Sequence, residues 1–491
     1  MNEHFSLDTC LFRMGDTPWT IRQAVEGVSI MGSIGAGKSS GSARFIALKF
    51  LQAGFGGLVL CAKPDEAGTW RNYCYQTGRL EDLIVVEPDG EYHFNFLGHE
   101  AQRKASKLGA TQNIAQVLKT VIRSGQEKAT GKSDDVFWES ALDMLIHNVV
   151  ELCLIAYDTL SVERLYDIAA SAPKKESDSA KDKDSAFHLA MRAAQAHINE
   201  ALKALKNDMP AGELERMNKK EYESFILKHV PLAQRLKRVD DFFIGHYRSL
   251  SEKTRSIIDF YLSGFLFVLS NEPVRSLFCN ETSNFTPEDS LKGKIILLNI
   301  PVKTFHKAGH YCQILFKFIW QRAMESRDIA ENDRPVFLWA DEAQHFLHEY
   351  DSEFQATARS SRIATVYISQ NLPNYYASMG GERFEHRVKS FLGTLGTKIF
   401  HANADIETNR YASELIGDAY IEDVSVSQNI GENTNLGSAK SYKLERMVRP
   451  EDFVRLKNGS VDNSHLIEAL VHLQSRTFSS GWNHERITFR Q

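Results

Sequence analysis

An eight-residue stretch near the start of the chain, Gly32-Ser33-Ile34-Gly35-Ala36-Gly37-Lys38-Ser39, constrains the fold more than any other feature. It satisfies the pattern G-x-x-x-x-G-K-[ST], in which small residues let backbone N–H groups converge on a phosphate. The apolar run 27–31 before it predicts a buried strand, and residues 39–52 after it have apolar side chains at helical spacing. The pattern requires a glycine-bearing loop between a strand and a helix, so the sequence predicts a phosphate-binding loop in an α/β fold.

The chemistry of this loop predicts a nucleoside triphosphate and magnesium as its ligands. Lys38 is expected to bridge the β- and γ-phosphates, and Ser39 to ligate Mg²⁺. The helix that starts here points its positive end at the phosphates. We therefore expect ATP and Mg²⁺ as cofactors. The predicted nucleotide-binding residues are Gly32, Ser33, Ile34, Gly35, Ala36, Gly37, Lys38, Ser39 and Ser40.

A second part of the predicted site comes three hundred residues later. Residues 336–340 form an apolar run typical of a buried strand, and Asp341 and Glu342 follow it. At the carboxyl edge of a parallel sheet, Asp341 is expected to hold Mg²⁺ through water, and Glu342 to polarise the attacking water. An acidic pair after an apolar strand is also a common surface feature. Together with the phosphate loop it predicts an ATPase, because hydrolysis needs both metal anchorage and water activation.

Three further side chains have two interpretations each. Gln370 follows the predicted strand 365–368 and is either a sensor of the γ-phosphate or an ordinary polar strand end. Arg359 and Arg362 precede that strand. One of them either stabilises phosphoryl charge in a neighbouring subunit or forms a surface ion pair, and the sequence does not decide between the two arginines.

Short apolar runs bounded by polar or turn residues recur along the chain and predict parallel strands buried on both faces. Between residues 100 and 290 the pattern changes to apolar residues at helical spacing, without strand signals. The predicted fold class is therefore α/β, with a mainly parallel central sheet interrupted by an inserted all-α domain. The predicted strands are 27–31, 58–62, 83–86, 295–300, 336–340, 365–368 and 398–401. The predicted domains are a lead-in 1–26, sheet segments 27–100 and 291–491, and a helical insertion 101–290.

Two segments have the composition of surface loops. Residues 174–185 are charged and lack large apolar side chains, which predicts a solvated, mobile loop, with a docking tether as the alternative. Residues 424–441 are rich in Ser, Asn and Gly, which predicts an exposed hairpin or loop.

The overall composition excludes few classes of function. The formal net charge of −5 over 491 residues is no basic signature, so contact with DNA would depend on a few local basic loops. The six cysteines form no CxxC pair, which is typical of reduced thiols.

No secretory signal is visible at the start. The most hydrophobic stretches, 144–157 and 257–270, are shorter than the ~20 residues that a spanning helix needs. We interpret both as buried helices and expect a cytoplasmic protein.

The order of the motifs resembles the type IV secretion coupling ATPases (TraD/TraG class) within the HerA/FtsK superfamily of P-loop motor ATPases. After the second predicted strand the chain carries Cys61-Ala62-Lys63-Pro64-Asp65-Glu66, like the charged cluster at this point of the family. Phe137-Trp138-Glu139-Ser140-Ala141 then opens a long helix, and Arg449-Pro450-Glu451-Asp452 comes late, both in the family's order. Each of these motifs is short, and the resemblance depends on their order over most of the chain.

The resemblance implies a RecA-like motor domain in a homo-oligomer, a hexamer, that binds ATP between subunits and translocates or transfers DNA. The alternative is an ATPase subunit of a bacterial defence or mobile-element complex that gates an effector. A scaffold that binds ATP without turnover is disfavoured by Glu342. Two departures are expected, because residues 1–26 leave room neither for the family's membrane span nor for a HerA-like β-barrel. Lys63 and Asp65 stand in the reverse of the family's order, which leaves their roles open.

Overall fold

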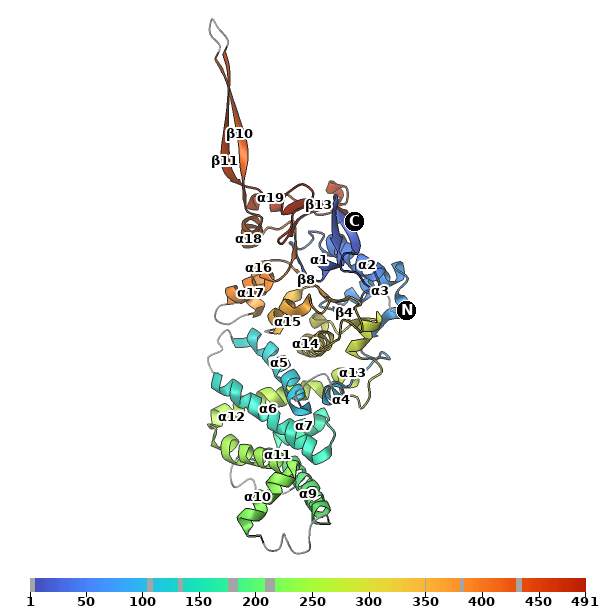
Figure 1. The fold of residues 1–491 in the computed structure, drawn as a ribbon, viewed down its shortest axis with the longest axis vertical. Helices are drawn as coiled ribbons and strands as arrows, with labels where there is room; N and C mark the ends of the chain where they lie inside the picture. Colours follow the sequence, from blue (N-terminus) through green and yellow to red (C-terminus); the bar gives the residue numbers. More distant parts are fainter. Residues whose placement is uncertain are drawn as a thin grey trace. The chain divides into compact units, whose positions relative to one another are not determined.

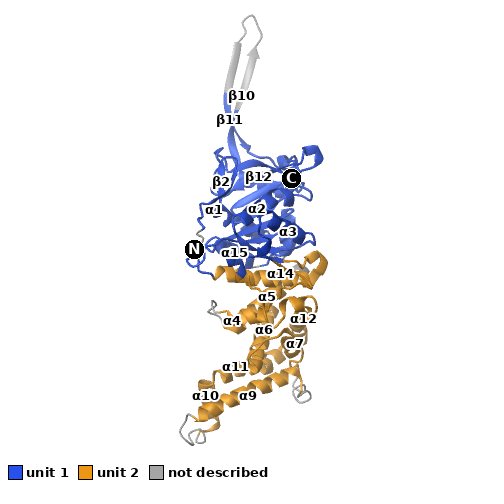
Figure 2. Ribbon diagram, turned by 90° about the vertical axis from the view of Figure 1, so that its right-hand side faces the viewer, with its two compact units in different colours: residues 1–83, 289–297, 327–491 blue, residues 84–288, 298–326 orange. Residues whose placement is uncertain are grey.

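The structure is a computed structural model, and it describes residues 5–103, 109–130, 136–174, 184–207, 217–348, 350–379, 384–429 and 435–491. The chain divides into two compact units (Figure 2). The first, here called the sheet unit, consists of Met1–Leu83, Asp289–Leu297 and Arg327–Gln491. The second, the helical unit, consists of Ile84–Glu288 and Leu298–Ser326.

The sheet unit is built on a mainly parallel sheet with the strand order β13-β12-β9-β3-β8-β7-β4-β6. Figure 1 labels β4, β8 and β13 of this sheet. Strand β3 pairs in parallel with β8 and β9, and β7 pairs in parallel with β4 and β8. Strand β12 is antiparallel to both of its neighbours. The predicted α/β class with a mainly parallel sheet is confirmed. The strand bounds are β3 (Val28–Met31), β4 (Gly56–Leu60), β6 (Ile295–Leu298), β7 (Val336–Ala340), β8 (Ile363–Ser369), β9 (Thr397–His401), β12 (Leu466–Leu473) and β13 (His484–Arg490).

Every predicted strand is present, although most bounds shift by one or two residues. Strand β5 (Leu83–Val86) begins at the last residue of the sheet unit. The sequence analysis missed β12 and β13. Strand β12 reads LIEALVHL, in which leucine, alanine and glutamate are good helix formers, so its composition concealed a strand that pairs on both sides.

The predicted helix 39–52 consists of a π-helical turn, Ser39–Ala43, followed by α2 (Arg44–Gln52). The start of the chain also holds a hairpin, β1 (Cys10–Met14) with β2 (Thr17–Thr20). The other helices of this unit are α1 (Ile21–Ala24), α3 (Glu66–Gln76), α15 (Tyr350–Ala358), α16 (Leu372–Met379), α17 (Phe384–Gly393), α18 (Ile406–Ile416) and α19 (Pro450–Val454).

The segment predicted as a hairpin or loop at 424–441 belongs to a long antiparallel hairpin, β10 (Asp418–Asn429) with β11 (Asn435–Arg446). Side chains near its base, such as Tyr420 and Tyr442, are exposed. The hairpin is longer than the predicted segment 424–441. Its ends were not predicted because they also contain apolar residues.

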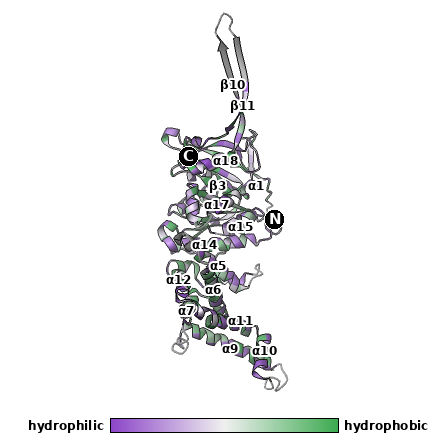
Figure 3. Ribbon diagram, turned by 90° about the vertical axis from the view of Figure 1, so that its left-hand side faces the viewer, coloured by the Kyte–Doolittle hydropathy of each residue, from purple (hydrophilic) through white to green (hydrophobic). Residues whose placement is uncertain are grey.

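The helical unit packs through the helical faces that the sequence predicted. Leu145, Val149 and Leu152 of α6 are buried, as are Ile198 of α9 and Leu262 of α12. The helices of this unit carry both hydrophobic and hydrophilic residues (green and purple in Figure 3). The unit begins at Ile84 and includes α14, which the sequence analysis had assigned to the second sheet segment. Nine residues of the predicted loop, 175–183, lie outside the described residues. The helices are α4 (Phe96–Gln102), α5 (Ala110–Thr130), α6 (Val136–Tyr157), α7 (Val162–Ala170), α9 (Ala186–Asn207), α10 (Lys219–His229), α11 (Pro231–Asp240), α12 (Glu252–Leu269), α13 (Val274–Phe278) and α14 (Val302–Glu325).

One helical stretch among the described residues, Phe137–Tyr157 in α6, is long and apolar enough to cross a membrane by length and composition alone. Of an 18-residue apolar segment within this stretch, 61% is buried inside the structure. Such burial is what the core helix of a helical unit shows, and it agrees with the interpretation of 144–157 as a buried helix.

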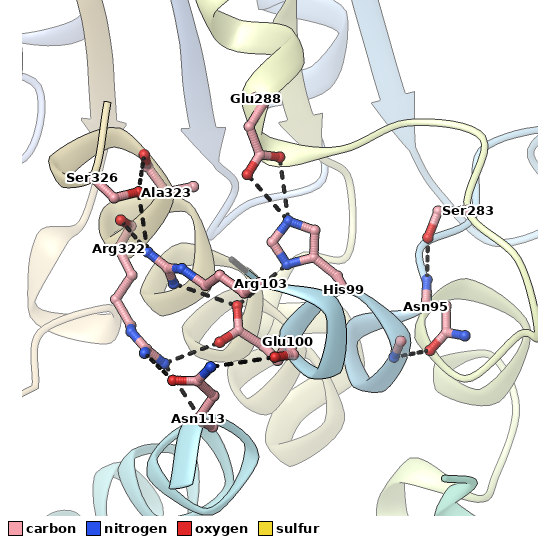
Figure 4. Close-up of polar contacts among 11 residues, drawn as sticks. Asn95, His99, Glu100, Arg103, Asn113, Ser283, Glu288, Arg322, Ala323 and Ser326 are labelled. Carbon is pink, nitrogen blue, oxygen red and sulfur yellow. Dashed lines mark hydrogen bonds and ion pairs between the residues drawn. The ribbon is translucent and has the colours of Figure 1, made fainter. Parts of the chain in front are cut away.

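A polar cluster joins α4 to α14 inside the helical unit (Figure 4). The carboxylate of Glu100 is fully buried, and Arg322 Nη1 lies 3.0 Å and Arg103 Nη1 3.5 Å from its oxygens. The ring of His99 lies 3.2 Å from Glu100 through Nδ1 and 3.2 Å from Glu288 through Nε2. Burial alone would lower the pKa of His99, but the two carboxylates outweigh it and raise the pKa to about 9.

Candidate active site

The parallel strands bring the separate parts of the predicted site to one edge of the sheet. The phosphate loop follows β3 and the acidic pair follows β7, and both strands run parallel to β8, which lies between them. Ser39 Oγ donates a hydrogen bond of 3.1 Å to Asp341 Oδ2, across 302 residues of sequence. The geometric condition for a shared triphosphate and metal site is therefore met.

The phosphate loop has a backbone that only glycine adopts easily at two positions. Gly35 has φ +74° and Gly37 has φ +81°. A Cβ atom on Gly37 would also come within 2.6 Å of the side chain of Ile467 on β12. Lys38 Nζ donates to the carbonyl oxygens of Gly32 (2.5 Å) and Ser33 (3.0 Å), so the ammonium group lies against the loop. Burial lowers the pKa of Lys38.

The acidic pair has an uncommon backbone geometry. Glu342 has φ +51° and ψ +50°, a left-handed conformation that costs a non-glycine residue about 1–3 kcal/mol. Its amide nitrogen donates to Asp341 Oδ1 at 2.8 Å. The turn thereby directs the two carboxylates separately, Asp341 toward Ser39 and Glu342 toward a set of polar partners. Burial, with the nearby charge of Glu342, raises the pKa of Asp341.

Glu342 is held by three side chains. Lys63 Nζ lies 2.9 Å from Oε1, and Gln344 Nε2 donates to Oε2 at 2.8 Å. Gln370 Nε2 lies 3.3 Å from each carboxylate oxygen. Burial alone would raise the pKa of Glu342, but these partners, with Lys63 first, lower it to about 2. The carboxylate is therefore ionised and oriented throughout the neutral pH range.

Lys63 is a site residue whose role the sequence analysis left open. It follows β4, which pairs in parallel with β7, so it reaches the same sheet edge as Glu342. Burial alone would lower the pKa of Lys63, and the charges of Asp341 and Glu342 raise it. The signal available in the sequence was its position directly after a buried apolar run, the same context as that of the acidic pair.

Gln370 connects the acidic pair to the phosphate loop. Its carbonyl oxygen accepts a hydrogen bond of 3.0 Å from Asn403 Nδ2. Asn403 Oδ1 in turn accepts one of 3.1 Å from Ser33 Oγ. A continuous polar chain thus joins Glu342, Gln370, Asn403 and Ser33, and the sensor role of Gln370 stays a prediction. Asn403 and Gln344 were missed, because single amides after a strand or in a turn are too common to single out.

Neither predicted arginine lies at the phosphate site of its own chain. Both precede β8, so they lie at the amino edge of the sheet, whereas the phosphate loop lies at the carboxyl edge. Arg362 Nη1 donates to the carbonyl oxygens of Phe5 and Asp333 and pairs with the Asp333 carboxylate at 3.3 Å. The side chain of Arg359 is 61% exposed and lies 3.7 Å from Glu26. A role in a neighbouring subunit stays a prediction, for which Arg359 has the more available side chain.

The donor set fits Mg²⁺ and a triphosphate. The Ser39 hydroxyl and the Asp341 carboxylate are hard oxygen ligands, and Mg²⁺ commonly takes one or two protein oxygens beside phosphate and water. A divalent cation would also offset the burial that raises the pKa of Asp341. Ser40 is half-buried on the turn after Ser39.

Comparisons with known proteins find one matching family and several solved structures of similar fold. Residues 335–458 match the family described as the TraM recognition site of TraD and TraG. A search of curated protein sequences gives no match. This match confirms the resemblance to TraD and TraG over residues 335–458, and the following structures confirm the likeness of fold.

Three solved structures share the fold over nearly the whole chain, each at 12–13% sequence identity. The bacterial conjugative coupling protein TrwBΔN70, in its unbound monoclinic form, matches with a TM-score of 0.59, covering 98% of this chain and 88% of that chain. The plasmid coupling protein TrwB with ADP and Mg²⁺ matches at 0.59, covering 99% and 89%. TrwB with the non-hydrolysable ATP analogue ADPNP matches at 0.55, covering 99% and 89%. The RecA-like α/β fold is thereby confirmed.

Proposed function

We propose that this chain is a Mg²⁺-dependent ATPase motor of the conjugative coupling type, which works as a hexamer and transfers DNA or a nucleoprotein. The observation that carries the proposal is the contact between Ser39 and Asp341, with Glu342 beside them. The TrwB structures with ADP and Mg²⁺ and with ADPNP support the same ligands here. The near full-length likeness to coupling proteins favours this function over the gating of an effector.

The side chains divide the work of hydrolysis. Lys38, buried against the loop, would transfer its hydrogen bonds from the carbonyl oxygens of Gly32 and Ser33 to the β- and γ-phosphates. Ser39 and Asp341 would hold Mg²⁺, which supplies positive charge to the transferring phosphoryl group when bound. Glu342, ionised and oriented by Lys63 and Gln344, would polarise the attacking water.

Gln370 would transmit the state of the nucleotide within one subunit, and Arg359 would act on the site of a neighbouring subunit. The polar chain from Glu342 through Gln370 and Asn403 to Ser33 would report the loss of the γ-phosphate to the sheet. Arg359, at the opposite sheet edge, would act on the site of the next subunit in a ring. Movement along DNA would depend mainly on phosphate contacts and would therefore weaken as salt rises.

The proposed partners are other copies of this chain, DNA and proteins of a transfer complex, including a TraM-like protein at residues 335–458. We propose a cytoplasmic location, with any contact to the inner membrane made through partner proteins.

The test is the ATPase rate of the purified chain with single-stranded DNA, with double-stranded DNA and without either. We expect hydrolysis that needs Mg²⁺ and rises several-fold with DNA, and no hydrolysis by Lys38→Ala. An unstimulated rate would exclude DNA as the substrate of the motor. Light scattering with ADPNP and Mg²⁺ is expected to show a hexamer, and a monomer under all conditions would contradict the ring.

A further inference from the structure

His401, the last residue of β9, is a buried histidine that the mechanism proposed above does not use. Its side chain lies close to the phosphate loop, and it is completely shielded from solvent. Burial, with the nearby charge of Lys38, lowers the pKa of His401 to about 3. The imidazole is therefore neutral at physiological pH, with one nitrogen that donates a hydrogen bond and one that accepts.

The ring of His401 contacts the turn that follows the phosphate loop. His401 Nε2 and Ser42 Oγ lie at a hydrogen-bond distance of 2.7 Å, across 359 residues of sequence. Ser42 is fully buried and belongs to the π-helical turn Ser39–Ala43, which begins with the proposed magnesium ligand. Turns of this kind are rare within helices and occur frequently at functional sites. The histidine thus holds an uncommon backbone turn next to a ligand of the metal.

The same histidine also contacts the first residue of the loop. A Cβ atom on Gly32 would come within 2.7 Å of the Cβ atom of His401, so a larger residue at position 32 would push the two segments apart. His401 therefore lies against both ends of the phosphate loop, at Gly32 where the loop begins and at Ser42 on the turn after it.

The residues that follow His401 hold the start of the loop through hydrogen bonds. The amide nitrogen of Ser33 donates to the carbonyl oxygen of Ala402 at 2.9 Å, and the amide nitrogen of Ala404 donates to Ser33 Oγ at 3.1 Å. Ser33 Oγ also donates to Asn403 Oδ1 at 3.1 Å. Segment 401–404 is thus fixed to the start of the loop, and the contact between His401 and Ser42 extends this hold to its other end.

We propose that His401 is a positioning residue for nucleotide binding, which holds the phosphate loop and the turn after it in the conformation that accepts a triphosphate. The inference rests on the proposed function, because it requires a triphosphate in the loop at 32–39. A loop that already has its binding conformation loses less entropy when the ligand binds. Without the bond to His401, the turn can rearrange and move Ser39 and the backbone amides away from the phosphates.

Ser42→Ala tests the proposal, because it removes one buried hydroxyl and keeps the size of the side chain. We expect it to bind ADPNP with Mg²⁺ about 10-fold more weakly than the wild type, by calorimetry at a temperature at which both are folded. The control is Ser413→Ala, which removes another buried hydroxyl of the sheet unit, one that donates to the carbonyl oxygen of Val448. It should lower the Tm without weakening ADPNP binding.

Wild-type affinity for ADPNP in Ser42→Ala, with only a lower Tm, would show that the histidine stabilises the fold and would overturn the inference. Failure of the wild type to bind ADPNP would instead overturn the proposed function. These two results are distinct, because the first requires a wild type that binds.

Variants of His401 test the other side of the same bond. His401→Gln keeps a nitrogen that can reach Ser42 and should retain most of the affinity, whereas His401→Leu should bind as weakly as Ser42→Ala. The double variant Ser42→Ala/His401→Leu should bind no more weakly than either single variant, because each removes the same bond. Losses that add in full would overturn the inference. If His401→Leu does not fold, Ser42→Ala and His401→Gln decide the question.

Discussion

The ammonium nitrogen of Lys63 lies 2.9 Å from Oε1 of Glu342, so the residue that follows β4 holds the carboxylate that follows β7. Lys63→Met removes the main cause of the low pKa of Glu342 and one of the groups that orient it. We expect the rate of ATP hydrolysis to fall at least 10-fold, with the dissociation constant for ATP changed less.

A matched control for Lys63 is Lys294→Met, which breaks a 3.2 Å ion pair with Asp82 in the same unit. Steady-state kinetics and ATP titration of both variants are the measurement. Equal turnover in wild type and Lys63→Met would show that Glu342 needs no support from the end of β4.

Glu342→Gln tests the catalytic base directly. The amide retains the size of the side chain but cannot accept a proton, so turnover should fall about 10²–10⁴-fold. ATP should still bind, because Lys38 and Ser39 are unchanged. Rapid-quench measurement of product in a single turnover separates binding from chemistry. Turnover at the wild-type rate would remove Glu342 from the role of base.

Arg359 can be tested by mixing subunits. Arg359→Ala should lose about 10³-fold or more in turnover if its guanidinium stabilises phosphoryl charge. Mixed with Lys38→Ala, it should recover part of the activity, because some interfaces then combine an intact Lys38 with an intact Arg359. Arg476→Ala is the control, since Arg476 also pairs with Glu26, at 3.3 Å. Mixtures as inactive as each variant alone would argue against donation across an interface.

His99 gives the helical unit a stability that depends on pH. Its folded-state pKa of about 9 lies above the ordinary histidine value, so its stabilising contribution is complete below about pH 6.5 and is lost as the pH rises through 9. His99→Asn should therefore lower the free energy of unfolding by about 1–3 kcal/mol at pH 6.5 and by much less at pH 10.

Urea denaturation followed by circular dichroism at the two pH values measures the effect on the helical unit. His229→Asn, on the exposed end of α10, is the control and should show no such difference. A loss of stability in His99→Asn that is the same at pH 6.5 and pH 10 would show that the ring acts by packing and not by charge.

Local patterns predicted much of the sheet and the centre of the site. Short apolar runs such as 336–340 predict a strand that is buried on both faces, because every side chain in the run is apolar. The phosphate loop is similarly local, since its glycines, lysine and serine are adjacent in sequence and define their own backbone shape. For these parts, the chemistry could be read before the fold was known.

The remaining site residues depended on neighbours that are remote in sequence. Gln344 and Asn403 are ordinary polar residues in the sequence, and nothing local marks them as partners of Glu342 or Gln370. Lys63 directly follows an apolar run, but nothing local pairs it with Glu342. The left-handed backbone of Glu342 could not be predicted either, since glutamate rarely adopts this conformation. Strand β12 was missed because its residues favour a helix unless both of its edges are paired.

The sequence by itself determined that a phosphate loop and an acidic strand end exist, because each is a short stretch whose residue types carry the chemistry. The tertiary structure alone decided that they meet through Ser39 and Asp341, that Lys63 holds Glu342, and that Arg362 is engaged by Asp333 of its own chain. The physical reason is the lateral order of the strands. That order is set by the packing of large buried surfaces between segments hundreds of residues apart. No local sequence pattern predicts it.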